Sequence, residues 1–264
     1  MMELFIVPRA GIWCRSLSGW DAFRAALAAG HEPEARLPEP VPDLLPAREA
    51  RRAPLHVRLA IEVGTQACRE NAVPLADVMT VFASAAGDTQ ITDYLCRALA
   101  GPAPMLSPTK FHTSVHNAAS GYWSIGAANR LASVAVAAQS GTFPAGLLEA
   151  ACLAICGHVT VLLVAYDVPA PPPLDAVSGN RQPFAVGLLL SSRQITPQWR
   201  ALSLEYRVAP SPGSEPGAPF LRDLATENDC ARSLALLEAL AGQDAASLAL
   251  PLNDAGHLYI NLGT

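Results

Sequence analysis

Residues 131–166 form a long stretch with almost no charge, and this stretch limits the folds open to the chain more than any other. Its ionisable side chains are Glu149, Cys152, Cys156, His158 and Tyr166. By composition alone, a window of this stretch resembles a transmembrane helix. It is interrupted, however, by Gln139-Ser140-Gly141, by Pro144 and by Gly157-His158. We therefore interpret it as three short buried elements, strand 133–138, helix 142–155 and strand 159–167, with no membrane span.

Strands and helices also alternate in the rest of the sequence. Strand patterns occur at 4–12, 77–84, 183–192 and 201–209, and helical patterns at 20–30, 55–71, 89–101 and 228–242. This alternation predicts an α/β fold with a mixed, mainly parallel central sheet flanked by helices. We expect one domain over 1–264. It comprises a core over 1–167, a proline-rich connection over 168–183, and shortened C-terminal strands and a helix over 184–264.

The composition excludes two broad classes of protein. Hydrophobic residues make up 51% of the chain and charged residues 16%, so the chain can bury a substantial core, and intrinsic disorder is excluded. The net charge is −5, and the basic residues form no run longer than Arg51-Arg52. A nucleic-acid partner is therefore not expected, because such proteins carry a basic stripe. The apolar excess fits a large core, or apolar surface that is left for a partner.

The N-terminus and the cysteines predict a cytoplasmic protein. The sequence MMELFIVPRAGIWCRSLSGW lacks the basic start and long apolar run of a signal peptide. The six cysteines are scattered and form no CxxC, which favours reduced thiols over a disulfide or zinc framework. We expect Cys152 and Cys156 to pack as small apolar side chains on a buried helix.

Common catalytic and metal-binding patterns are absent from the sequence. It contains no GxSxG, no GxxxxGK[ST] and no HExxH. His112 and His116 have the i, i+4 spacing that could hold a metal, but no third ligand lies nearby in the sequence. We therefore expect no metal and no cofactor.

The segment VAAQSGTFPAG (136–146) has the pattern of a strand that runs through a glycine-containing turn into a helix. Such a turn presents one side chain at a helix N-terminus, where free N–H groups and the helix dipole activate a thiol or stabilise an anion. Gln139 occupies this turn, and an amide is not a nucleophile. A tight turn with a polar surface residue explains the pattern equally well.

Three segments in order, SPTKFHTSVHNAASGYWSI, SVAVAAQSGTFPAGLLEA and VTVLLVAYDVP, resemble the N-terminal half of a β-ketoacyl synthase. The resemblance covers roughly residues 1–190. It is closest to short ketosynthase-like chain length factors of aryl-polyene clusters and of type II polyketide synthases. It implies a truncated thiolase-like fold, and it places Gln139 where ketosynthases have the nucleophilic cysteine.

The resemblance also implies a role and partners. Ketosynthases use two histidines from a C-terminal half, whereas this chain has only His257 after residue 190. The resemblance therefore implies a subunit without independent activity. It would form a heterodimer with a full-length ketosynthase, shape the acyl tunnel in fatty acid, polyketide or aryl-polyene elongation, and meet the acyl carrier protein only indirectly. The residues it assigns to the tunnel or interface are Phe111, His112, His116, Asn117, Ser140 and Phe143.

Two other functions stay open at this point. A malonyl-carrier-protein decarboxylase would use the glutamine-substituted site and would need His112, His116 or His257 as donors. An unrelated serine hydrolase would use Ser120 or Ser140 as its nucleophile. The non-catalytic ketosynthase-like subunit is the leading hypothesis, and these two functions are its alternatives.

Overall fold

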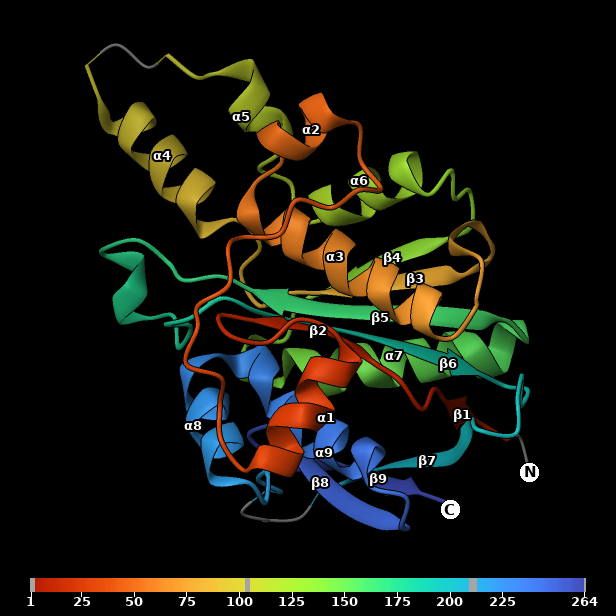
Figure 1. The fold of residues 1–264 in the computed structure, drawn as a ribbon. Helices are drawn as coiled ribbons and strands as arrows, with labels where there is room; N and C mark the ends of the chain where they lie inside the picture. Colours follow the sequence, from red (N-terminus) through yellow and green to blue (C-terminus); the bar gives the residue numbers. More distant parts are fainter. Residues whose placement is uncertain (1–2, 103–104, 209–212, 264) are drawn as a thin grey trace.

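The computed structural model describes residues 3–102, 105–208 and 213–263. Figure 1 shows a central sheet with helices on both faces. The strands are β1 (Phe5–Ile6), β2 (Gly11–Cys14), β3 (Met79–Ala83), β4 (Ser133–Val136), β5 (Thr160–Asp167), β6 (Phe184–Ser191), β7 (Arg200–Arg207), β8 (Ala246–Asn253) and β9 (Gly256–Leu262). The α-helices are α1 (Trp20–Ala29), α2 (Ala47–Arg52), α3 (Leu55–Glu70), α4 (Thr89–Ala100), α5 (Pro108–His112), α6 (Ala118–Gly126), α7 (Thr142–Gly157), α8 (Pro219–Glu227) and α9 (Leu234–Ala241).

The sheet is mixed, as predicted, but the prediction that it is mainly parallel is wrong. Its described strands follow the order β4-β3-β5-β6-β1-β7-β9-β8, and β2 pairs with β6. Only β3 pairs in parallel, with β4 and with β5. All other described pairings are antiparallel. Parallel neighbours need a crossover connection. Helices α4, α5 and α6 connect β3 to β4, and α7 then connects β4 to β5.

Two helices pack on opposite faces of this sheet (Figure 1). Helix α3 lies against β2, β5 and β6, and its approach depends on the paired glycines Gly11 and Gly187. A Cβ at either glycine would overlap the carbonyl oxygen of Val63 on α3. Helix α7 contacts β3 and β5 on the other face. There, a Cβ on Gly146 would lie 2.8 Å from the Cβ of Ala83.

Helix α7, with the turn before it, is the stretch whose composition resembles a membrane span. Residues Gln139–Gly157 are long and apolar enough by length and composition, but half of this window is buried inside the fold. Its buried side chains include Phe143 and Leu147, which belong to the hydrophobic core. One side of this helix therefore belongs to the core of the fold.

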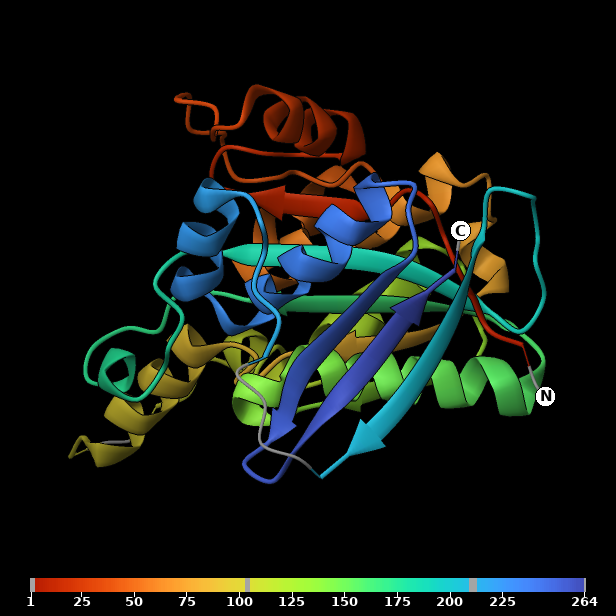
Figure 2. The same ribbon diagram turned by 90° about the horizontal axis from the view of Figure 1, so that it is seen from below.

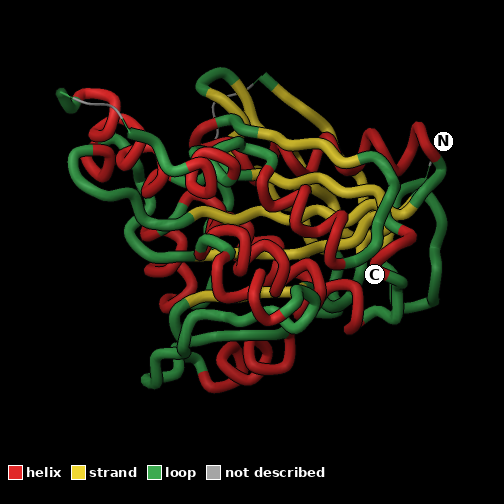
Figure 3. Tube along the Cα trace, turned by 90° about the horizontal axis from the view of Figure 1, so that it is seen from above, coloured by secondary structure: helices red, strands yellow, loops and turns green. Residues whose placement is uncertain are grey.

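The C-terminal strands lie beside α7, as Figure 2 shows. Strand β8 contacts the turn that precedes α7, where Gly141 lies against the backbone of Leu252. Figure 3 shows the strands between helices, with both chain ends at the end of the sheet away from α4 and α5. The strand pair β8–β9 confirms the hairpin that the sequence predicts around Asn253.

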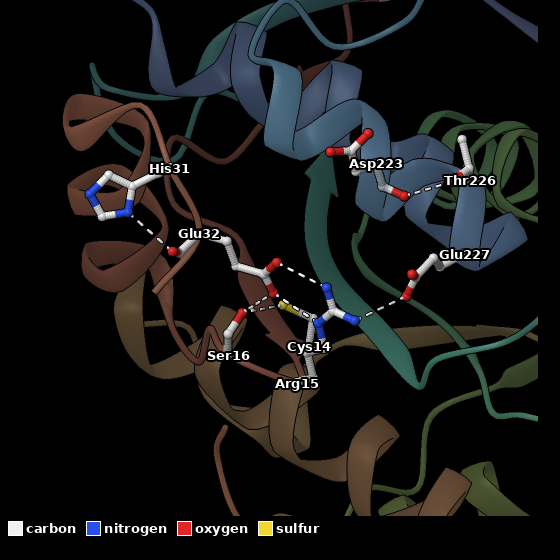
Figure 4. A network of polar contacts seen from close by, with 8 residues as sticks. All are labelled: Cys14, Arg15, Ser16, His31, Glu32, Asp223, Thr226 and Glu227. Carbon is white, nitrogen blue, oxygen red and sulfur yellow. Dashed lines mark hydrogen bonds and ion pairs between the residues drawn. The ribbon is translucent and has the colours of Figure 1, made fainter. Parts of the chain in front are cut away.

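A polar network ties the turn after β2 to the end of α8 (Figure 4). The Arg15 guanidinium donates two hydrogen bonds to Glu32, each 3.1 Å long, and lies 3.4 Å from Glu227 at the end of α8. The Ser16 hydroxyl also donates to Glu32. Burial raises the pKa of Glu32, but the hydrogen bonds from Arg15 and Ser16 outweigh it, so the pKa is lowered overall.

Candidate functional site

The turn between β4 and α7 places Gln139 in a left-handed backbone conformation. Its φ is 48°, which is rare for a residue with a side chain. The Thr142 hydroxyl holds the turn, because it accepts from the Ala138 amide at 3.0 Å and donates to the Gln139 carbonyl oxygen at 2.6 Å. The side chains of Gln139 and Ser140 are exposed. A strained residue at a helix N-terminus is common where function requires one displayed side chain.

Gln139 and Ser140 line a cavity of about 550 Å³. One wall comes from the loop between β3 and α4 and from the first turn of α4. The opposite wall comes from the connection after β5 and from the segment after α8. The lining residues are Ala85, Ala86, Thr89, Thr92, Gln139, Ser140, Leu174, Val177, Ser178, Gly179, Asn180 and Asp229.

A buried carboxyl group lies between the segments that form these walls. Asp167, at the end of β5, is 1% exposed. It accepts from the Ser84 hydroxyl at 2.8 Å, from the Ala85 amide at 3.0 Å and from the Cys230 thiol at 3.2 Å. Burial raises the pKa of Asp167, and these hydrogen bonds offset the effect only in part. Burial also raises the pKa of the Cys230 thiol, and the neighbouring Asp167 carboxylate adds to that shift.

The raised pKa of Asp167 makes a prediction about stability and pH. The folded state binds this proton more tightly than the unfolded chain does, so the carboxyl favours folding at low pH. Its contribution is lost as the pH rises from about 4, the ordinary value for aspartate, through the folded pKa. We expect the unfolding free energy of the wild type, minus that of Asp167→Asn, to fall between pH 4 and pH 8 in urea titrations. A difference that rises with pH contradicts the assignment.

The structure distributes the six predicted tunnel or interface residues over four places. Phe111 and His112 are exposed on α5, and His112 lines a separate cleft between α4 and α5. Asn117 is exposed before α6, and His116 is half-buried with Nε2 2.9 Å from the Ser84 carbonyl oxygen. Of the six, Ser140 lines the Gln139 cavity. Phe143 is fully buried in the core. Their tunnel or interface role stays a prediction.

Strand β4 leaves one edge of the sheet open among the described strands. The carbonyl oxygens of Ala132 and Val136 accept from the amide of Thr80 in β3 and from that of Ser84 just after it. Because backbone groups alternate sides along a strand, the N–H and C=O of Ser133 and Ala135 point away from β3. Large apolar side chains in the segments before β4 are also exposed, namely Phe111, Val115, Ile125 and Leu131. An open sheet edge and exposed apolar side chains are each typical of surfaces that bind a partner.

The side of α7 that faces away from the sheet carries two cysteines that the sequence predicts to be buried. Cys152 and Cys156 are exposed, so the expectation that they pack inside a buried helix is wrong. They lie one helical turn apart on the side of α7 that faces away from the sheet, while Leu147 and Ala154 face the core. Burial and the neighbouring Glu149 raise the pKa of Cys152, so it is a poor nucleophile at neutral pH.

The described residues give little support to acid–base or metal chemistry at this turn. No histidine is among the described residues that line the Gln139 cavity. Groups of three or more His, Cys, Asp or Glu that could hold a metal are not found in the described part of the chain. Ser120 is buried, and its hydroxyl donates to the Asn117 carbonyl oxygen at 2.9 Å, which gives it no activating base.

Comparison with known families now identifies the fold. Residues 20–219 match the N-terminal domain family of β-ketoacyl synthases, which is well over half of the chain. The chain belongs to the β-ketoacyl synthase family. Its mixed sheet between helices is accordingly the thiolase-like fold that the resemblance implied. No curated protein matches the sequence significantly.

Solved structures match this chain over nearly its whole length. A chain in the complex of the ketosynthase ApeO with its chain length factor ApeC, from Xenorhabdus doucetiae, has TM-score 0.73 and 25% identity. The match covers 99% of this chain and 100% of that one. The ishigamide ketosynthase/chain length factor has TM-score 0.72 and 14% identity, with 98% and 99% covered. The type II polyketide complex AntDE:AntF has TM-score 0.77 and 11% identity, with 100% and 99% covered. The resemblance to chain length factors is confirmed.

Proposed function

We propose that this chain is a non-catalytic ketosynthase-like subunit. It pairs with an active β-ketoacyl-carrier-protein synthase and shapes the tunnel that holds the growing acyl chain. The observation that carries the proposal is Gln139, which occupies the strained turn at the N-terminus of α7. This is the place where the family resemblance puts the ketosynthase nucleophile.

The chemistry of the turn supports the absence of independent condensation. An amide cannot take up an acyl group as a thioester, so the first step of a ketosynthase reaction has no nucleophile here. The cavity beside Gln139 also has no histidine among its described lining residues to stabilise a developing enolate. The same observation leaves a malonyl decarboxylase without its donors. Ser140 has no described base beside it, which leaves a serine hydrolase without support.

The open edge of β4 supports the proposed pairing. A partner strand that adds antiparallel to β4 would use the free N–H and C=O groups of Ser133 and Ala135. The side chains along this edge are small, so two backbones can approach closely. Three of the solved structures that match this chain contain a ketosynthase together with a chain length factor or a carrier protein. We therefore take the partner to be a ketosynthase.

The role of Gln139 itself can be tested with Gln139→Gly. Glycine adopts the left-handed conformation without strain, so the turn is retained while the amide is removed. We expect elongation by the assembled complex to stay within about twofold of the wild type, and the isolated chain to gain up to about 1 kcal/mol of stability. The measurement is the product yield per complex, with thermal unfolding as the control. A loss of turnover greater than tenfold at full assembly would give Gln139 a catalytic role and contradict the proposal.

Assembly is tested by co-expression of this chain with the ketosynthase from the same source. We expect the two chains to co-purify as one complex in equal amounts, and the ketosynthase to elongate acyl chains only in its presence. We expect the isolated subunit to release carbon dioxide from malonyl carrier protein only at the background rate. Carbon dioxide release above background would favour the decarboxylase instead.

A further inference from the structure

Asp167 joins the two walls of the Gln139 cavity, although its own side chain is buried behind them. The carboxylate lies at the end of β5 and contacts segments that are far apart in the sequence. Its partners are the loop after β3 and the short helical segment Asp229–Ser233 that follows α8. One buried group therefore couples two parts of the chain that lie far apart in the sequence.

The first wall is held through Ser84 and Ala85. The Ser84 hydroxyl donates to Asp167 and accepts from the Gly87 amide at 2.9 Å, and the Ala85 amide donates to the same carboxylate. The residues that follow, Ala86 and Thr89, line the cavity. His116 reinforces this loop from outside through its contact with the Ser84 carbonyl oxygen.

The second wall is held through Cys230 and Asn228. The Cys230 thiol donates to Asp167, and the Asn228 amide donates to the Asp167 carbonyl oxygen at 3.1 Å and to the Gln182 carbonyl oxygen at 2.8 Å. Asp229, between these two residues, lines the cavity, and its amide donates to Asn180 at 2.9 Å. Asp167 thus fixes the Asp229 side of the cavity relative to the Ala86 side.

We infer that Asp167 is a positioning residue that sets the width of the Gln139 cavity, and through it the length at which the growing chain stops. This inference rests on the proposed function, because the cavity must belong to the acyl tunnel of the complex. Asp167 does not touch the acyl chain, so it acts through the two walls. If Asp167 is removed, the Ser84 hydroxyl, the Ala85 amide and the Cys230 thiol lose a shared partner. The distance between the two walls then varies, and the complex makes products of a wider range of lengths.

The test compares product lengths made by the reconstituted complex. With Asp167→Ala we expect the share of the main wild-type product to fall at least twofold and longer products to increase, while the pairing affinity stays within threefold. Cys230→Ser keeps a donor toward Asp167 and is expected to retain the wild-type distribution, whereas Cys230→Ala is expected to shift it partly. Asn71→Ala serves as the matched control, because Asn71 binds the carbonyl oxygens of Arg9 and Ala67, away from the cavity.

The outcomes separate this inference from the proposed function. A wild-type chain that does not change the products of the ketosynthase removes the proposed function. A wild-type chain that sets product length, with an unchanged distribution in Asp167→Ala and in Cys230→Ala, overturns the role of Asp167 alone. A purely structural role would lower the melting temperature of Asp167→Ala and Asn71→Ala alike and leave both product distributions unchanged. If Asp167→Ala does not fold, the two Cys230 variants decide.

Discussion

Ala135→Pro is expected to weaken pairing with the ketosynthase about 100-fold while leaving the subunit folded. The Ala135 N–H points away from β3, so proline removes no bond within the sheet, and proline is tolerated at such edge positions. On the outer side, however, its ring replaces a donor and blocks a partner strand. The combined cost is about 3 kcal/mol, which corresponds to about a 100-fold rise in Kd. The measurement is Kd by titration of the two purified chains.

Ala135→Ser is the matched control for this substitution. Serine keeps the backbone N–H donor and adds only a hydroxyl group, so we expect Kd to stay within about threefold of the wild type. The melting temperatures of the two variants should both lie close to that of the wild-type subunit. If the proline variant still pairs with wild-type affinity, β4 is not the pairing edge, and another surface must bind the partner.

A large effect on the fold itself is expected from Gly141→Ala. Gly141 lies in the turn before α7, and an added Cβ would overlap the carbonyl oxygen of Leu252 and lie 2.8 Å from its carbonyl carbon. Both are backbone atoms of β8, so no side chain can move aside to relieve the contact. We expect a loss of about 3 kcal/mol in unfolding free energy, which lowers the melting temperature by roughly 10 °C.

Gly121→Ala provides a control of opposite sign. Gly121 lies within α6, and nothing in the described structure lies within 4 Å of a Cβ added there. Alanine lowers the entropy of the unfolded chain and favours the helix, so we expect a gain of about 0.5–1 kcal/mol. Equal effects of the two substitutions would contradict the close approach of β8 to Gly141.

The elements around the candidate site could be predicted because their signals are local. The uncharged stretch from 131 to 166 contains its own interruptions at Gln139-Ser140-Gly141 and at Gly157-His158. The observed β4 ends and α7 begins near the first, and α7 ends and β5 begins near the second. The hairpin at Asn253 and the helix that ends at Gly30 are marked by turn residues in the same way. Position in a turn is thus recoverable from a single sequence.

Features that depend on distant contacts could not be predicted. Helices α2 and α8 lie in segments for which the sequence predicts no helix, because tertiary packing rather than propensity stabilises such short helices. The direction of β6 depends on how the connection 168–183 returns to the sheet, which has no local signal. The contacts of Asp167 join residues 84, 167 and 230, and a lone aspartate at the end of a strand does not reveal them.

The most direct test of the account is elongation by the purified ketosynthase with and without this chain. The readout is the amount and length of acyl or polyene product on carrier protein at matched ketosynthase concentrations. The account predicts little product from the ketosynthase alone, and full product of one dominant length when the two chains form the complex. A ketosynthase that gives the same amounts and lengths without this subunit, together with a subunit that stays monodisperse and unpaired, would contradict it.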